Sequence, residues 1–143
     1  MEDARAQMAY GLSVCDILKI SDNEIQWFSG KEDYTEGIHM LQQTCQIPLI
    51  LLSMGKDGSR AYYKDMLVEV PAFLQKNTIE TTGAGDTFGA CCLHHILKYG
   101  LDNLTKQQLK EMLTFANAAA SIITTRKGAL RVMPSLEEIQ RLL

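Results

Sequence analysis

The sequence predicts an α/β fold, in which helices are layered on a short sheet. Short apolar runs alternate with longer amphipathic segments along the 143 residues. Residues 49–53 are almost continuously apolar, as expected for a strand that is covered on both faces. Two long segments after residue 84 carry apolar side chains at helical spacing, which favours α-helices there. We therefore expect a single α/β domain over residues 1–143.

Polar capping patterns predict where the helices begin. In chain order, the predicted elements are a helix over 2–10, a strand over 14–20, helices from 21 and from 33, a strand over 49–53, strands over 59–64 and 66–70, and helices over 85–99, from 105 and from 135. In a capping box, the hydroxyl or carboxylate of the first residue accepts a hydrogen bond from the backbone N–H three residues later. The acid or amide side chain of that later residue accepts in turn from the backbone N–H of the first. Such pairs occur at Ser21 and Glu24, Asp33 and Glu36, Thr105 and Gln108, and Ser135 and Glu138.

Glycine and proline predict where elements end. Gly11, Gly100 and Gly128 are expected to close helices, and Pro71 to end the second strand of the hairpin. Within the first half of the chain, the aromatic pair Trp27–Phe28 is expected to pack in the core.

Composition excludes several classes of function. The net charge is -3 and no Lys/Arg cluster is present, so nothing favours a nucleic-acid partner. No apolar run has the length of a membrane span, and the acidic opening Met1–Arg5 lacks the apolar region of a signal peptide, so we expect a cytoplasmic protein. The four cysteines form no C-x-x-C pair, which predicts reduced thiols rather than a zinc site or redox motif.

The most informative stretch is the glycine-rich turn over residues 81–88, T-T-G-A-G-D-T-F, at the start of a predicted helix. Small residues allow a ligand to approach the backbone closely, and the first turn of a helix has unpaired N–H groups that attract anions. Asp86 beside such a phosphate site could accept the proton of an attacking hydroxyl. A turn without chemistry, in which Asp86 only opens the helix, is an equally good interpretation of this stretch alone.

Two other glycine motifs are excluded. The P-loop pattern G-x-x-x-x-G-K-[ST] is absent from the chain. Gly83, Gly85 and Gly89 are spaced G-x-G-x-x-x-G, which differs from the dinucleotide-binding fingerprint.

The stretch from Thr81 to Ala90 resembles the second signature of the ribokinase-like, PfkB carbohydrate kinases, and most resembles fructokinases. The resemblance implies the C-terminal half of a ribokinase-like three-layer α/β/α sandwich. It also implies ATP-dependent phosphoryl transfer to a sugar hydroxyl, with Mg²⁺ as cofactor. On this resemblance Asp86 is the catalytic base, and the amides of Gly83, Ala84 and Gly85 form the anion hole.

Other segments agree with this family in order and spacing. Ser21-x-x-Glu24 resembles its N-x-x-E region, which implies that Glu24 positions the magnesium shell, although a helix cap alone also explains the pattern. Residues 52–58 resemble the T-L-G-x-x-G loop, which could equally be a turn before a hairpin, and residues 115–121 and 125–129 resemble the adenine-pocket segments. The resemblance assigns nucleotide contacts to Ser53, Gly55, Gly58, Asn117, Ser121 and Gly128. Without the resemblance, Asn117 would be expected to face solvent.

One position departs from the family pattern. The family often binds a monovalent cation beside the anion hole, next to the Asp that opens D-T-T-G-A-G-D. Here Glu80 occupies that position, and its extra methylene argues against K⁺ or shifts the geometry of its site.

The resemblance begins near the middle of the family pattern, which predicts that the sugar-binding and lid half is absent. We therefore expect the chain alone to self-associate through uncovered surface and to phosphorylate sugar poorly. An inactive nucleotide-binding or interaction module remains the alternative. Keto-deoxygluconate or a nucleoside remains an alternative to fructose as the acceptor.

Overall fold

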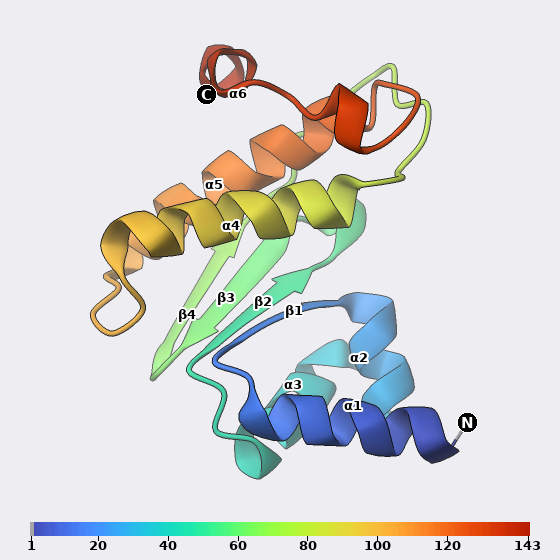
Figure 1. Ribbon diagram of the computed structural model, residues 1–143, viewed down its shortest axis with the longest axis vertical. Coiled ribbons are helices and arrows are strands. Elements are labelled where there is room, and N and C mark those ends of the chain that lie inside the picture. The colour runs from blue at the N-terminus through green and yellow to red at the C-terminus, as the bar shows by residue number, and fades with distance from the viewer. Residues whose placement is uncertain (1) are drawn as a thin grey trace. The chain divides into compact units, whose positions relative to one another are not determined.

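The computed structural model describes residues 2–143, and its helices and strands are arranged along the chain as an α/β protein (Figure 1). The elements are α1 (Glu2–Val14), β1 (Ile17–Ser21), α2 (Asp22–Ser29), α3 (Tyr34–Thr44), β2 (Leu49–Ser53), the 3-10 turn η1 (Gly55–Asp57), β3 (Ser59–Tyr63), β4 (Met66–Val70), α4 (Ala84–Tyr99), α5 (Lys106–Ile123), the 3-10 turn η2 (Leu130–Val132) and α6 (Leu136–Leu142). Among these helices, none combines the length and the apolar character that crossing a bilayer requires.

Four strands form one sheet in the order β1-β2-β3-β4. Strands β1 and β2 are parallel, with Ile17 opposite Leu49 and Ser21 opposite Ser53. This register brings the carboxyl ends of both strands to the same edge, which is where open α/β sheets bind ligands.

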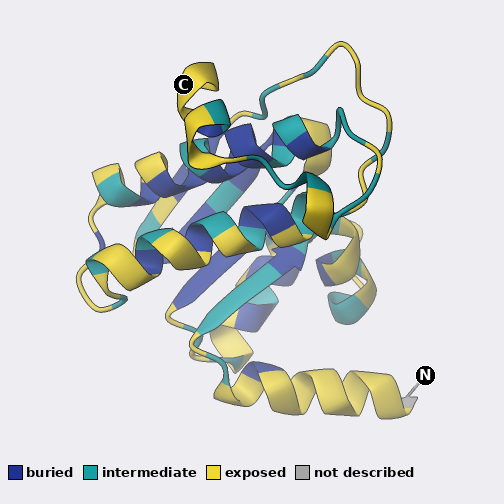
Figure 2. Cartoon of the chain, turned by 45° about the horizontal axis from the view of Figure 1, so that its top comes forward, coloured by how far each residue is buried: buried dark blue, intermediate teal, exposed yellow. Residues whose placement is uncertain are grey.

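The chain divides into two compact units, residues 1–54 with 61–67 and residues 55–60 with 68–143. In the first unit, helices α2 and α3 pack together (Figure 1). Its core consists of Leu12, Ile20, Ile25, Ile38, Leu41, Ile50, Leu52, Met54 and Tyr62. Over residues 3–14, helix α1 is exposed almost throughout, as Figure 2 shows, and Leu12 is the one buried residue there.

Three local expectations were wrong. Helix α1 continues through Gly11 to Val14, because a glycine inside a helix costs only about 1 kcal/mol and does not end it. Helix α5 ends at Ile123, five residues before Gly128, and the chain then makes tight turns. Trp27 is 41% exposed and not in the core, and the guanidinium of Arg5 lies 5.2 Å from its ring centroid.

In the second unit, α4 and α5 lie side by side and α6 packs on α5 (Figure 1). Each of the two long helices presents a buried face and an exposed face (Figure 2). Cys92 is fully buried within α4 and its neighbour Cys91 is partly buried. Burial raises the pKa of the Cys91 thiol to about 11 and raises the pKa of Cys92 further.

Candidate anion and nucleotide site

The turn before α4 requires a glycine at its first position. Gly83 is the N-cap of α4 and has φ 78°, in the left-handed region. A Cβ atom built on Gly83 would lie 3.2 Å from the Cβ of Ala129 and 3.2 Å from Cδ1 of Ile123. Both the backbone conformation and the close approach of the Ala129 segment therefore select glycine.

Backbone N–H groups at this turn are left without protein acceptors. The N–H of Ala84 donates to the carbonyl of Thr81 at 3.1 Å, and the N–H of Thr87 donates to that of Gly83 at 2.9 Å. Within residues 2–143, the N–H groups of Gly83, Gly85 and Asp86 have no hydrogen-bond acceptor. Unpaired amides at the start of a 16-residue helix attract an anion. The sequence predicted the amides of Gly83, Ala84 and Gly85, whereas in the structure the Ala84 amide closes a turn.

Asp86 lies in the first turn of α4 and its side chain is exposed. In the described part of the chain, its carboxylate accepts no hydrogen bond and forms no ion pair. Its oxygens are therefore available to a ligand hydroxyl. The next residue, Thr87, is buried, and its hydroxyl oxygen finds no partner among the described residues. Sequence reasoning gave Thr87 no role.

The loop over residues 55–58 is built around two glycines with positive φ. Gly55 has φ 53° and Gly58 has φ 99°, and the N–H of Gly58 donates to the Gly55 carbonyl at 3.3 Å. A Cβ atom on Gly58 would lie 2.2 Å from the carbonyl oxygen of Val70. The end of β4 thus passes directly against this loop. The nucleotide contacts expected of Gly55 and Gly58 stay a prediction.

Asn117 is buried within α5, so the solvent-facing alternative is wrong. Its Nδ2 donates to the carbonyl of Val70 at 3.2 Å and to that of Pro71 at 3.0 Å. An amide nitrogen has two protons, and both are used to hold the end of β4. The structure therefore gives Asn117 a packing role, and its expected contact with adenine remains untested.

Ser121, one turn further along α5, is also buried. Its hydroxyl donates to the carbonyl of Ala118 at 2.8 Å and accepts from Nε2 of Gln75 at 3.2 Å. Gln75 belongs to the long connection between β4 and α4, so Ser121 anchors that connection to α5. Its predicted contact with the nucleotide is likewise untested.

The segment after α5 is held at several points. The carbonyl of Thr124 accepts from the N–H of Ile79 at 2.8 Å, and Gly128, with φ 117°, donates its N–H to Oε1 of Glu80 at 2.6 Å. Glu80, at the position where the family pattern suggested a cation ligand, thus accepts a hydrogen bond from a backbone N–H.

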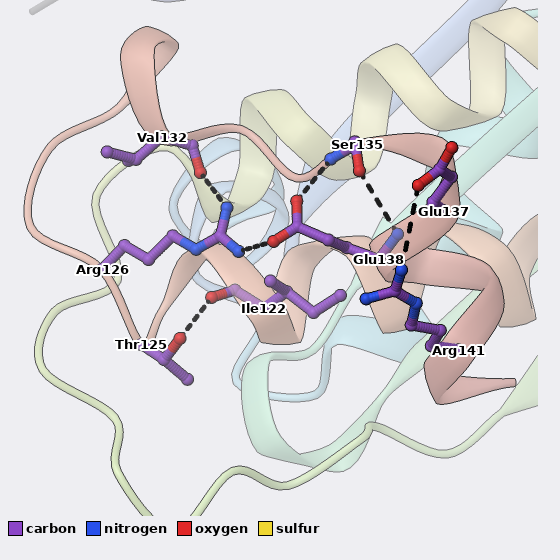
Figure 3. Close-up of polar contacts among 8 residues, drawn as sticks. All are labelled: Ile122, Thr125, Arg126, Val132, Ser135, Glu137, Glu138 and Arg141. Atoms are coloured by element: carbon purple, nitrogen blue, oxygen red, sulfur yellow. Dashed lines mark hydrogen bonds and ion pairs between the residues drawn. The ribbon is translucent and has the colours of Figure 1, made fainter.

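Figure 3 shows how the same segment is joined to α6. The guanidinium of Arg126 donates to the carbonyl of Val132 at 3.0 Å and forms an ion pair with Glu138. Glu138 also completes the capping box of α6, because its carboxylate accepts the N–H of Ser135 at 2.8 Å. This N–H contributes most to lowering the pKa of Glu138, and Arg126 adds to the effect.

Two further predicted site residues lie in the first unit, at the carboxyl ends of the parallel strands. Ser53 ends β2, opposite Ser21 at the end of β1. Glu24 closes the capping box of α2, since its Oε2 accepts the N–H of Ser21 at 2.7 Å while Ser21 Oγ accepts the N–H of Glu24 at 3.2 Å. The cap is therefore confirmed.

The magnesium role of Glu24 stays a prediction. The N–H of Ser21 is the main cause that lowers the pKa of Glu24, and Lys19 Nζ at 3.9 Å from Oε2 adds to it. The carboxylate is thus kept in the form that a hard cation prefers. Among the described residues, no group of three or more His, Cys, Asp or Glu side chains gathers as a metal site.

The chain is similar to known carbohydrate kinases. The profile of the pfkB family carbohydrate kinases matches residues 1–136. Fructokinase-1 of Zea mays is 32% identical over 142 residues, which are 99% of this chain and 44% of the relative. Probable fructokinase-2 of Arabidopsis thaliana is 33% identical over 134 residues, 94% of this chain and 40% of the relative. The chain thus spans less than half the length of these curated relatives.

The fold agrees with that of solved kinase structures. The fructokinase of Vibrio cholerae O395, solved with fructose, ADP and a calcium ion, superimposes with a TM-score of 0.90 at 25% identity, over 99% of this chain and 45% of that one. Aminoimidazole riboside kinase of Salmonella enterica shares the fold with a TM-score of 0.85 at 23% identity, over 98% of this chain and 46% of that one. The expected ribokinase-like α/β fold is therefore confirmed, and the chain belongs to the pfkB family of carbohydrate kinases.

Proposed function

We propose that this chain forms the nucleotide-binding and catalytic part of an ATP-dependent carbohydrate kinase, with fructose as the favoured acceptor. One observation carries the proposal: unpaired amides at the start of α4 stand beside the exposed, unpartnered carboxylate of Asp86. Phosphoryl transfer requires a site that stabilises negative charge and a base for the nucleophile, and this turn offers both.

Each group in the turn has a role in this proposal. The N–H groups of Gly83 and Gly85 donate to phosphate oxygens while charge develops on the transferred group. Asp86 accepts the proton of the sugar hydroxyl. Mg²⁺, when bound, would neutralise charge on the phosphates of ATP, and the role of Glu24 toward its water shell is proposed from the resemblance to the family.

The relatives support the choice of substrate. Two plant fructokinases match nearly all of this chain, and the Vibrio cholerae fructokinase was solved with fructose and ADP. We therefore place fructose before keto-deoxygluconate or a nucleoside. Because transfer by the chain alone is expected to be poor, an assay of all three acceptors with MgATP compares their relative rates. Nucleotide binding with no detectable transfer to any acceptor would support the binding-module alternative for this chain.

Two substitutions at Gly85 test the anion hole directly. Gly85→Pro removes an N–H that has no acceptor in the described chain, and proline is tolerated in the first turn of a helix. The matched control, Gly85→Ala, keeps this N–H. We expect calorimetric titration with MgADP to show binding by the unsubstituted chain and by Gly85→Ala, and about tenfold weaker binding by Gly85→Pro. Absence of binding by the unsubstituted chain, or equal affinity of the two variants, would contradict the proposal.

A further inference from the structure

The segment that leads into the α4 turn and the segment that follows α5 are joined by three hydrogen bonds. The N–H groups of Ile79 and Glu80 both donate to the carbonyl of Thr124, at 2.8 and 3.3 Å. The carboxylate of Glu80 then accepts the N–H of Gly128 at 2.6 Å. These contacts join residues more than forty positions apart in the sequence, and all of them lie within the second unit.

The post-α5 segment is also the surface against which the anion-binding turn packs. A Cβ atom on Gly83 would meet Ala129 at 3.2 Å, so the backbone at the start of α4 rests on the residue directly after Gly128. The placement of the unpaired amides therefore depends on where residues 128 and 129 stand.

Few side-chain atoms pack around Gly128 itself. It has φ 117°, a conformation that only glycine adopts readily, and a Cβ atom there would have only Val132 within 4 Å, at 3.8 Å or more. Arg126 fixes the flanking chain through Val132 and Glu138, but neither contact involves the backbone of Gly128 itself. The N–H of Gly128 has the Glu80 carboxylate as its acceptor.

We propose that Glu80 is a positioning residue: its carboxylate holds the segment 124–129 against the Gly83–Asp86 turn and so keeps the anion site formed before a nucleotide binds. The expected effect of Glu80 on nucleotide affinity rests on the proposed function. The contact itself is independent of that function. A hydrogen bond to an ionised acceptor is about twice as strong as a neutral one, and it removes an ordering cost that the ligand would otherwise meet.

Hydrogen exchange of the Gly128 amide, followed by NMR in the full 143-residue chain, tests the contact without any ligand. In Glu80→Ala the amide loses its acceptor, and we expect its exchange to accelerate by about tenfold or more. Glu80→Gln keeps a side-chain oxygen as acceptor and should restore much of the protection. Glu69→Ala is the matched control, because it removes a carboxylate of the same unit that pairs with Arg60 and not with Gly128.

Titration of the same proteins with MgADP tests the consequence. We expect Glu80→Ala to bind about tenfold more weakly than the unsubstituted chain, Glu80→Gln to bind at an intermediate level, and Glu69→Ala to bind normally. Unchanged Gly128 exchange in both Glu80 variants overturns the inference. So does accelerated exchange with unchanged affinity, because Glu80 would then hold a loop that does not shape the site. If the unsubstituted chain itself binds no MgADP, the proposed function fails, and the exchange result alone decides whether Glu80 holds the segment.

Discussion

Replacing Gly58 by alanine should strongly destabilise the second unit. The added Cβ would lie 2.2 Å from the Val70 carbonyl oxygen, 2.8 Å from the Cα of Pro71 and 2.9 Å from the backbone nitrogen of Ala72. All three are backbone atoms, so no side chain can rotate to make room. Either the loop or the end of β4 must move.

Two costs add up to the expected loss of stability in Gly58→Ala. Alanine at φ 99° costs about 1–2 kcal/mol because of the left-handed backbone. Forcing extra volume into packed structure costs about 1–3 kcal/mol more. The expected loss of about 2–5 kcal/mol is a large part of the 5–15 kcal/mol that stabilises a typical domain.

Urea unfolding followed by circular dichroism measures this loss, with two controls from the same unit. Gly100 has φ 79° but open space around its Cα, so Gly100→Ala should show the backbone cost alone. Gly89 lies inside α4 with open space and no positive φ, so Gly89→Ala should stabilise by about 0.5–1 kcal/mol. If Gly58→Ala loses no more than Gly100→Ala, the steric reasoning is refuted.

Three further predictions concern single polar groups. Asn117→Ala should cost about 1–3 kcal/mol in urea unfolding, because it leaves the carbonyls that now accept from Asn117 without a donor, and a neutral result would mean that water replaces the amide. Asp86→Asn should lower the weak phosphoryl transfer expected of this chain by about 10²–10⁴-fold, to below detection, while MgADP affinity is kept. A coupled assay and calorimetry measure the two effects, and a loss of MgADP affinity as well would assign Asp86 to binding. In the folded chain, Glu24 has a pKa below its ordinary value of 4.5, so its contribution to stability is present above that pH and is lost as the pH falls through the lowered pKa. Glu24→Gln should remove this part of the acid sensitivity of unfolding. Identical pH profiles of unfolding for the two proteins would contradict the assignment.

Local rules predicted the elements whose cause is local. The capping boxes at Ser21, Thr105 and Ser135 form as expected, because each needs only four consecutive residues. At the fourth predicted box, Asp33 instead caps α3 by accepting the N–H of Thr35. Strand β2 has the predicted bounds, since a five-residue apolar run fits a buried strand and little else. The ends at Gly11 and Gly128 were wrong because glycine permits a helix to end but does not force it to.

The site could be predicted only in part. The glycine turn and Asp86 are contiguous, so their chemistry was visible in the sequence. The contacts that hold them are not contiguous: Glu80 reaches Gly128 across 48 positions, and Asn117 reaches Val70 across 47. No periodicity or spacing rule encodes such pairs, and an isolated glutamate or asparagine therefore gave no sign of its partner.

The adjacent thiols of α4 provide a means of timing how often this helix opens. Alkylating reagents attack the thiolate, and the raised pKa of Cys92 keeps its sulfur protonated while the helix stays packed. Modification of Cys92 must then wait for a transient exposure of the helix, so its rate reports the population of opened molecules. Cys92 is therefore a natural probe of the opening of α4, the helix that also bears Asp86, and no label has to be introduced to use it.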